Sequence, residues 1–168
     1  MILDSFSDHP VVDGFGAADL ESFGSVLNPL ELSAEESIFD EGMATRGLVL
    51  LSQGVVEVRK QTDSGRPHVI TTLNAQTVLG EIEFMSGSTA SASVVAKTAV
   101  TALVLDREAF QDWLSSNTPC AGKLARNIGR VLARRLEETN LALIKLVKSG
   151  GVSEFDAFRD KLVTEWNF

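Results

Sequence analysis

The chain has 168 residues, of which 15 are Lys or Arg and 23 are Asp or Glu, so its formal net charge is −8 at pH 7. This length supports one compact domain, and 44% apolar with 23% charged residues is typical of an ordinary globular protein in water. Net acidity of this size disfavours nucleic acid or an anionic membrane surface as the main partner, because binding to phosphate needs a basic surface.

Individual residue types exclude further classes. Cys120 is the only cysteine, so an intrachain disulfide is impossible, and a reducing, cytoplasmic compartment is the simplest interpretation. Residues 1–10 lack the basic and apolar regions of a secretory signal, and no apolar stretch approaches the roughly 20 residues of a membrane span. His9 and His68 are the only histidines, and HExxH, GxSxG, Walker A and CxxC motifs are absent. We therefore expect neither a metal site nor a catalytic site.

Residues 1–29 are predicted to form an irregular leader and one short helix. Pro10, Asp13 and Gly14 interrupt any periodicity in the leader, whereas residues 17–26 carry apolar side chains at helical spacing. The Asn28-Pro29 pair should end this helix.

Residues 30–119 change to short apolar or alternating runs that are separated by turn residues. The expected strands are residues 37–39, 48–51, 56–58, 69–73, 93–96 and 100–105. Asp63-Ser64-Gly65 is typical of a hairpin turn. Short strands at this spacing predict an antiparallel jelly-roll barrel flanked by helices, so the fold class is α+β and mainly β.

The pattern becomes helical after Asp106, which is the expected N-cap of a short helix. The apolar residues Phe110, Trp113 and Leu114 should face inward from that helix.

A long helix is predicted over residues 120–148, before the stop signal Ser149-Gly150-Gly151. Leu132, Leu136 and Leu143 belong to an apolar stripe with heptad spacing. Because one barrel face cannot cover such a stripe, we expect a homodimer seam along it; the alternative is a helix that folds back on its own domain.

Residues 149–168 are predicted to hold a last amphipathic helix, with Ser153 at its start. One face carries Phe155, Phe158, Leu162 and Trp166. This helix either packs on the core or the dimer partner, or it docks another protein or closes a pocket as a lid.

Five short segments occur in an order and spacing that are more specific than any one of them. They are residues 39–42 (FDEG), 47–58 (GLVLLSQGVVEV), 78–82 (VLGEI), 93–96 (SVVA) and 103–110 (LVLDREAF). Together they resemble the cyclic-nucleotide-binding domain of the catabolite-activator, protein-kinase regulatory-subunit and cyclic-nucleotide-gated-channel superfamily. The resemblance covers residues 30–140 and implies an eight-stranded jelly roll with a long C-terminal helix that commonly dimerises.

The resemblance also identifies a ligand cassette over residues 80–94. It places Glu81 on the glutamate that accepts the ribose 2′-hydroxyl and Gly80 on the glycine that permits close backbone approach. Ser91 and Ser93 fall on positions that can donate to phosphate or base, and Ile82 belongs to the same candidate set. Glu81 has an alternative role, which is to accept hydrogen bonds from backbone amides at the strand-to-helix turn.

The cassette departs from the family pattern at the phosphate. The arginine that binds the phosphate falls ten residues after Gly80, where this chain has Ala90, and residues 67–96 contain no Lys or Arg. Glu83 stands where the family usually has a small residue. Helix-terminus amides, or one of three arginines of the long helix, are the remaining ways to pair a phosphate: Arg126, Arg130 or Arg134.

These features predict a non-enzymatic regulatory module that has lost ordinary cyclic nucleotide binding and acts by dimerisation and protein interaction. The alternative is a sensor that binds cAMP, cGMP or another small molecule in the cassette and signals through the long helix. We expect no cofactor beyond weakly bound cAMP or cGMP. A cupin-like barrel enzyme would need a metal-binding histidine pair, which two isolated histidines do not offer.

The basic residues of the long helix are expected to form a solvated face with local ion pairs to Glu137 and Glu138 rather than a nucleic-acid surface. Residues 149–168 also leave too little chain for the DNA-binding domain of the family's transcription factors, so we expect a free-standing module or part of a larger protein.

Overall fold

The computed structural model describes residue 6, residues 9–62 and residues 65–150. A 3-10 turn over Pro10–Val12 precedes four helices and eight strands in the described residues. In chain order these are α1 (Ala17–Gly24), β1 (Asn28–Leu32), β2 (Ser37–Phe39), β3 (Leu48–Gln53), β4 (Val55–Gln61), β5 (Pro67–Asn74), β6 (Thr77–Leu79), α2 (Glu81–Ser86), β7 (Ser93–Ala96), β8 (Val100–Leu105), α3 (Arg107–Ser116) and α4 (Thr118–Gly150).

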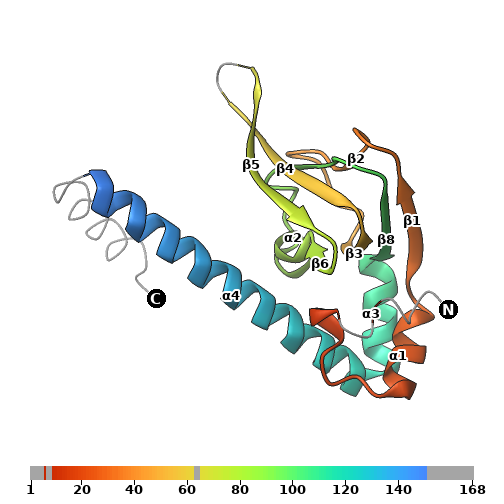
Figure 1. The fold of residues 1–168 in the computed structure, drawn as a ribbon. Coiled ribbons are helices and arrows are strands. Elements are labelled where there is room, and N and C mark those ends of the chain that lie inside the picture. Colours follow the sequence, from red (N-terminus) through yellow and green to blue (C-terminus); the bar gives the residue numbers. More distant parts are fainter. Residues whose placement is uncertain (1–5, 7–8, 63–64, 151–168) are drawn as a thin grey trace. The chain divides into compact units, whose positions relative to one another are not determined.

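The strands form two four-stranded sheets with the orders β1-β8-β3-β6 and β2-β7-β4-β5. Every pairing is antiparallel; Val49 of β3, for example, lies between Val104 of β8 and Leu79 of β6. The two sheets face each other as a jelly-roll barrel, and the β4–β5 hairpin extends beyond it (Figure 1). The predicted fold class, a mainly β antiparallel barrel with flanking helices and a long C-terminal helix, is confirmed.

Two strands, β1 and β6, were not predicted from the residue pattern. The Asn28-Pro29 pair does follow the end of α1, but it also opens β1, where proline is tolerated because β1 is an edge strand that pairs only with β8. β6 has only three residues, Thr77–Leu79, which is too short for a period of two to be visible.

The barrel interior is filled by apolar side chains. Leu48, Val49, Leu50 and Leu51 of β3 are fully buried, since the strand is covered on both faces. One cluster of inward side chains includes Phe39, and it extends to Ala90 in the cassette: Ile38, Phe39, Val49, Leu51, Val56, Leu79, Ala90, Val94, Ala96, Val100, Ala102 and Val104. The cassette is therefore built directly on the core.

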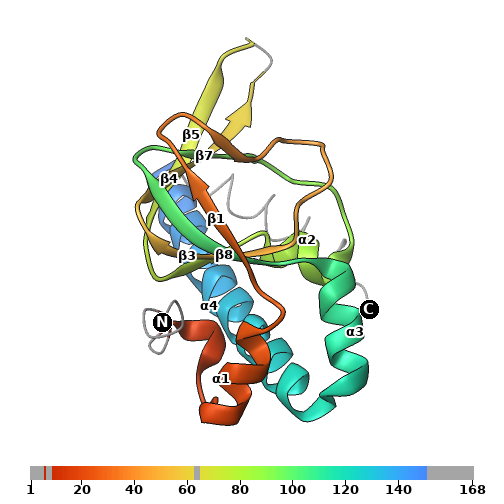
Figure 2. The same ribbon diagram turned by 90° about the vertical axis from the view of Figure 1, so that its right-hand side faces the viewer.

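Helices α1 and α3 lie side by side below the barrel (Figure 2). The rings of Phe23 and Trp113 are 5.5 Å apart between centroids, and the Trp113 indole N–H donates to Ser22 Oγ at 2.9 Å. Trp113 is buried as predicted, whereas Phe110 and Leu114 are only half-buried.

Asp106 occupies the N-cap position of α3, as predicted, although its side chain makes no capping hydrogen bond. Its Oδ2 instead accepts a hydrogen bond from Asn28 Nδ2 at 2.8 Å, which ties the start of α3 to β1. Asn28 can reach Asp106 because β1 begins beside the end of β8 in this antiparallel pair.

The part of the leader that the structure describes is packed rather than loose. His9, Val11 and Val12 are almost completely buried. Asn127 of α4 donates from Nδ2 to the carbonyl oxygens of Val11 and Asp13, at 2.9 and 2.8 Å. The leader, which lacks a periodic sequence pattern, therefore has an irregular backbone, and buried side chains together with the Asn127 amide hold that backbone in place.

Helix α4 begins at Thr118, two residues before the predicted start, because Pro119 is compatible with the first turn of a helix. The chain divides into two compact units at Gly129 and Arg130, so α4 contributes to both. The predicted helix that begins at Ser153 lies outside the described residues. No helix in the described ranges is long and apolar enough to cross a membrane.

Candidate functional site

The cassette is a turn, a short helix and a loop between β6 and β7. Gly80 has φ of +73° before α2, and Gly87 has φ of +79° after it. A Cβ atom on Gly80 would lie 2.9 Å from both the Gly47 carbonyl oxygen and Phe39 Cζ. Glycine is therefore required at position 80 by backbone conformation and by close packing within the chain.

The Glu83 carboxylate is the centre of the cassette's hydrogen bonds. It is 7% exposed, and its Oε1 accepts from the backbone N–H of Ser91 at 3.0 Å and from the Ser91 hydroxyl at 2.8 Å. These two donors belong to the segment in which the resemblance places the partners of a cyclic phosphate. An anion of this chain already occupies them.

The other candidate residues are spread over different environments. Glu81 is 4% exposed and already interacts within the chain, and both of its expected roles stay predictions. Ile82 is 51% exposed on the outer face of α2. The hydroxyl of Ser93 accepts from the Glu41 backbone N–H at 3.0 Å. Of these residues Glu81 is buried, whereas Ile82 and Ser91 are exposed, and Ser91 is tied to the cassette through Glu83.

Ala90 lies in the barrel core, where it is 4% exposed. Its backbone pairs with the loop after β2: the Gly42 N–H donates to the Ala90 carbonyl, and the Ala90 N–H donates to the Met43 carbonyl, both at 2.8 Å. The position that carries an arginine in the family is therefore anchored on its backbone and has an apolar side chain.

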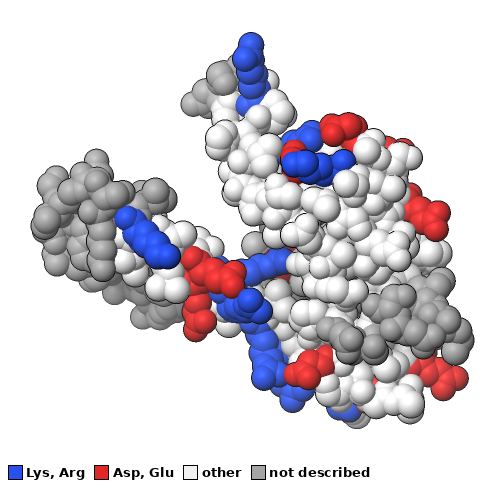
Figure 3. Space-filling model, in the orientation of Figure 1, with Lys and Arg blue, Asp and Glu red and all other residues white. Residues whose placement is uncertain are grey.

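Two of the three α4 arginines that were candidates for pairing a phosphate have neighbours outside the cassette. Arg134 pairs with Glu138 one turn further along the helix at 3.0 Å, which agrees with the expected local pairing. Arg126 Nη2 lies near Gly14 in the leader. On the face drawn in Figure 3, acidic side chains along the long helix have basic side chains on either side of them.

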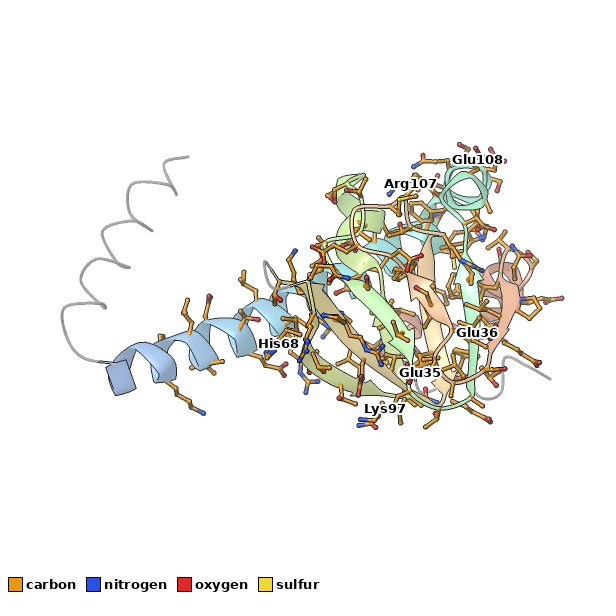
Figure 4. The ribbon with its side chains drawn as sticks, turned by 90° about the horizontal axis from the view of Figure 1, so that it is seen from above. Glu35, Glu36, His68, Lys97, Arg107 and Glu108 are labelled. Atoms are coloured by element: carbon orange, nitrogen blue, oxygen red, sulfur yellow. The ribbon has the colours of Figure 1, made fainter. Side chains whose placement is uncertain are left out.

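Two other cations do contact the cassette, and the sequence reading missed both. Lys60 of β4 donates from Nζ to the Ser91 carbonyl oxygen at 2.6 Å. Arg107, the first residue of α3 (Figure 4), donates from Nη2 to the Glu83 carbonyl oxygen at 2.5 Å. Both lie outside residues 67–96, so only the three-dimensional pairing of β4 with β7 and the chain path from β8 into α3 could reveal them.

Lys60 is also neutralised by a carboxylate. Its Nζ is 3.0 Å from Glu41 Oε1, and Glu41 Oε2 accepts from the Gln61 backbone N–H at 2.9 Å. The Gln61 hydrogen bond and the Lys60 ammonium together lower the pKa of Glu41 below its usual value. Lys60 is thus already paired with a charged carboxylate, and it contacts the cassette through a carbonyl oxygen.

No group of three or more histidine, cysteine, aspartate or glutamate side chains in the described part of the chain could hold a metal ion. The site as observed consists of hydrogen-bond donors that are already satisfied by a carboxylate, next to an apolar core.

Comparison with known proteins places this geometry in context. The family described as cyclic nucleotide-binding domain matches residues 29–117. A CRP-like cAMP-activated global transcriptional regulator of Mycobacterium tuberculosis is 24% identical over 137 residues, which are 82% of this chain and 59% of the regulator. The chain therefore spans about three-fifths of the length of this curated relative.

Solved structures show the same fold. A cyclic nucleotide-binding domain from Methylobacillus flagellatus aligns with a TM-score of 0.79 at 20% identity, over 87% of this chain and 84% of that one. The catabolite activator protein of Thermus thermophilus aligns with a TM-score of 0.70 at 26% identity, over 82% and 62%. A regulatory subunit of a cAMP-independent protein kinase A from Trypanosoma brucei aligns with a TM-score of 0.67 at 22% identity, over 78% and 46%.

Proposed function

The chain belongs to the cyclic nucleotide-binding domain family, and on that premise we propose that it is a non-enzymatic regulatory module that has lost ordinary cyclic nucleotide binding. It acts instead through dimerisation and contacts with other proteins. The observation that carries this proposal is the Glu83 carboxylate, which accepts both hydrogen bonds of Ser91 where a ligand phosphate would need them.

The missing arginine weakens phosphate binding by a predictable amount. Removal of one member of a buried, hydrogen-bonded charge pair costs about 2–5 kcal/mol, and each ~1.4 kcal/mol is a factor of ten in affinity. With Ala90 in place of the arginine, a micromolar site would become a millimolar one.

Glu83 adds repulsion to this loss. Two like charges about 4 Å apart repel by about 4 kcal/mol at an effective dielectric constant of about 20. Because Glu83 is 7% exposed, solvent screens this repulsion poorly. A cyclic phosphate would also have to displace the carboxylate from the Ser91 donors.

The Trypanosoma brucei regulatory subunit supports the same conclusion. That protein is described as cAMP-independent, and a mutant of it was solved with cAMP in its A site. The mutant replaces a glutamate by alanine and, seven and eight residues later, a threonine by arginine and a valine by alanine. Glu83, Ala90 and Ser91 have the same spacing in this chain.

Dimerisation is proposed through the part of α4 that follows Gly129. Leu136 is 51% exposed, and Leu132 and Leu143 are half-buried at heptad spacing. A leucine stripe of this kind is stabilised when a second helix covers it, and a second copy of the chain provides an identical stripe. Residues 153–168 remain the proposed contact for another protein.

The basic residues of α4 support a function without nucleic acid. Lys123 pairs with Asp19 at 2.7 Å and Arg134 pairs with Glu138, so these cations are partly neutralised within the chain. The buried thiol of Cys120, whose pKa burial raises to about 11, is consistent with the proposed cytoplasmic location.

The alternative function, a sensor for cAMP, cGMP or another small molecule, is favoured by one observation. Gly80, with φ of +73°, and the buried Glu81 stand at the two positions that the resemblance assigns to the ribose. The two functions differ in whether the intact chain binds cyclic nucleotide.

Calorimetric titration with cAMP and cGMP tests the proposal. We expect no binding to the natural chain below millimolar concentration, and micromolar binding to Glu83→Ala/Ala90→Arg, which frees both Ser91 donors and supplies the cation. The matched control is Glu83→Ala, which lacks the arginine and should not bind. Micromolar affinity of the natural chain would refute the proposal. A folded double variant that does not bind would contradict the assignment of the loss to these positions.

A further inference from the structure

The loop after α2 is exposed, yet internal contacts hold it on both sides. Gly87, Ser88 and Thr89 are exposed, whereas the next residue, Ala90, is buried and pairs with the loop after β2. Ser91 is bonded through its N–H and hydroxyl to Glu83, and through its carbonyl to Lys60. The anchoring therefore converges on Ser91, which is otherwise a surface residue.

Glu83 connects this loop to α3 through its other end. While its side chain binds Ser91, its main-chain carbonyl accepts from Arg107. The Arg107 guanidinium carbon lies 5.7 Å from the centroid of the Phe84 ring. The Phe84 ring packs edge-on against the ring of Phe110, with 5.1 Å between their centroids. One residue thus joins the cassette loop to the helix that follows the barrel.

We infer that the Glu83 carboxylate is a built-in anion of the cassette, with Arg107 as the positioning residue that holds it from α3. The cassette is thereby kept in one arrangement by the chain itself, and small anions in solution do not alter it. This inference rests on the proposed function and deepens it, because it describes how a cassette without ligand remains ordered and connected to α3.

The charge and hydrogen-bond inventory of the site supports this role. Ser91 provides two donors that converge on one point, Glu83 Oε1, and a carboxylate is the acceptor that binds convergent donors best. Substitution of Glu83 by alanine would leave both donors directed at an empty space of carboxylate size. That space should accept a small carboxylate from solution.

Amide hydrogen exchange of the full chain, read by mass spectrometry over residues 84–94, tests the inference. We expect Glu83→Ala to accelerate exchange around Ser91 by about ten-fold or more, since a hydrogen bond to a charged group is lost. Sodium formate should slow this exchange again in Glu83→Ala, and it should have no effect on the natural chain. Sodium chloride at the same ionic strength is the control.

Two further variants separate positioning from stability. Glu83→Gln keeps an acceptor of the same shape and should retain part of the protection. Arg107→Gln should accelerate exchange in α2 and in the loop that follows it, while exchange in β3 and β8 stays unchanged. Arg107→Lys should retain part of the protection that Arg107→Gln loses. Should Glu83→Ala fail to fold, Ser91→Ala, which removes only the hydroxyl donor, provides the same measurement with a smaller effect.

The inference is overturned if exchange around Ser91 is unchanged in a folded Glu83→Ala, or if formate does not slow it. This outcome is independent of the proposed function, which is overturned by micromolar cyclic nucleotide binding to the natural chain. Formate rescue with nucleotide binding would therefore retain the built-in anion and refute the loss of ligand binding.

Discussion

The two parts of α4 have similar apolar content and opposite surroundings. Before Arg130, Cys120, Leu124 and Ile128 are completely buried within the first compact unit. After Gly129, Leu136 and Leu141 are 51% and 58% exposed. A helical period of apolar residues therefore shows that a face exists, but it does not show what covers that face.

Polar residues mark the difference more clearly than apolar ones. Asn127, in the first part, is 1% exposed and binds two leader carbonyls through its amide nitrogen. Arg134 and Glu138, in the second part, bind each other, with side chains that are 80% and 62% exposed. In the first part, the buried Asn127 amide binds one particular segment, the leader. In the second part, the polar side chains form an ion pair exposed to solvent.

The largest expected effect is the loss of a buried leucine from the first part. Leu124→Ala should lower the free energy of unfolding by about 2–5 kcal/mol, because it removes apolar contacts and leaves a cavity in a packed interior. The matched substitution Leu141→Ala, at a 58% exposed site, should change it by about 0.5 kcal/mol or less. Urea unfolding of both variants measures the contrast. Equal losses would show that the second part is as tightly packed as the first.

The second expected effect concerns the assembly. Leu136→Asp should weaken self-association by about ten-fold or more, since a charge would have to be buried in an apolar seam. Sedimentation at several concentrations gives the mass, and Leu141→Asp, at the other helix face, is the control. An unchanged mass in Leu136→Asp would exclude a seam through that position.

The fold was predictable because its signals are local and redundant. Six strands, the pairing of β4 with β5 and the long helix each follow from alternation, turn residues or a period of 3.6, and they agree with one another. β1 and β6 were not predicted, because their strand character depends on pairing with β8 and β3 rather than on their own residues.

The site was predictable only in its residue types. The absence of a cation at Ala90 and the presence of Glu83 are visible in the sequence, because both lie within the cassette. The contacts of Lys60 and Arg107 are not, since these residues lie 31 and 24 positions from their cassette partners. A window of sequence cannot show which distant cation reaches a carbonyl.

The contacts of the leader could not be predicted from the sequence either, and His9 is the clearest example. His9 is 1% exposed; its Nε2 lies 3.0 Å from the Thr77 carbonyl, and its Nδ1 accepts from the Val11 N–H. The bond to the carbonyl requires a proton on Nε2, so the ring is neutral and uses both nitrogens. A second proton would place an N–H of Nδ1 against the N–H of Val11.

Acid should therefore destabilise this region, and the effect is the smallest of the three because it is absent at neutral pH. Burial lowers the pKa of His9 below its usual value of 6.5, and the Thr77 hydrogen bond only partly opposes this. The unfolded chain then binds a proton more readily than the folded one, so stability is complete above pH 6.5 and falls as the pH decreases below it. Urea unfolding at pH 7.5, 6.5 and 5.5 measures the fall.

His9→Gln, which keeps a donor for Thr77 but does not titrate, should remove that part of the pH dependence. Asp19, Glu41 and Glu57 do not interfere, because their pKa values are lowered and they lose their charge at more acidic pH. An equal fall in His9→Gln would mean that the leader is not the acid-sensitive contact.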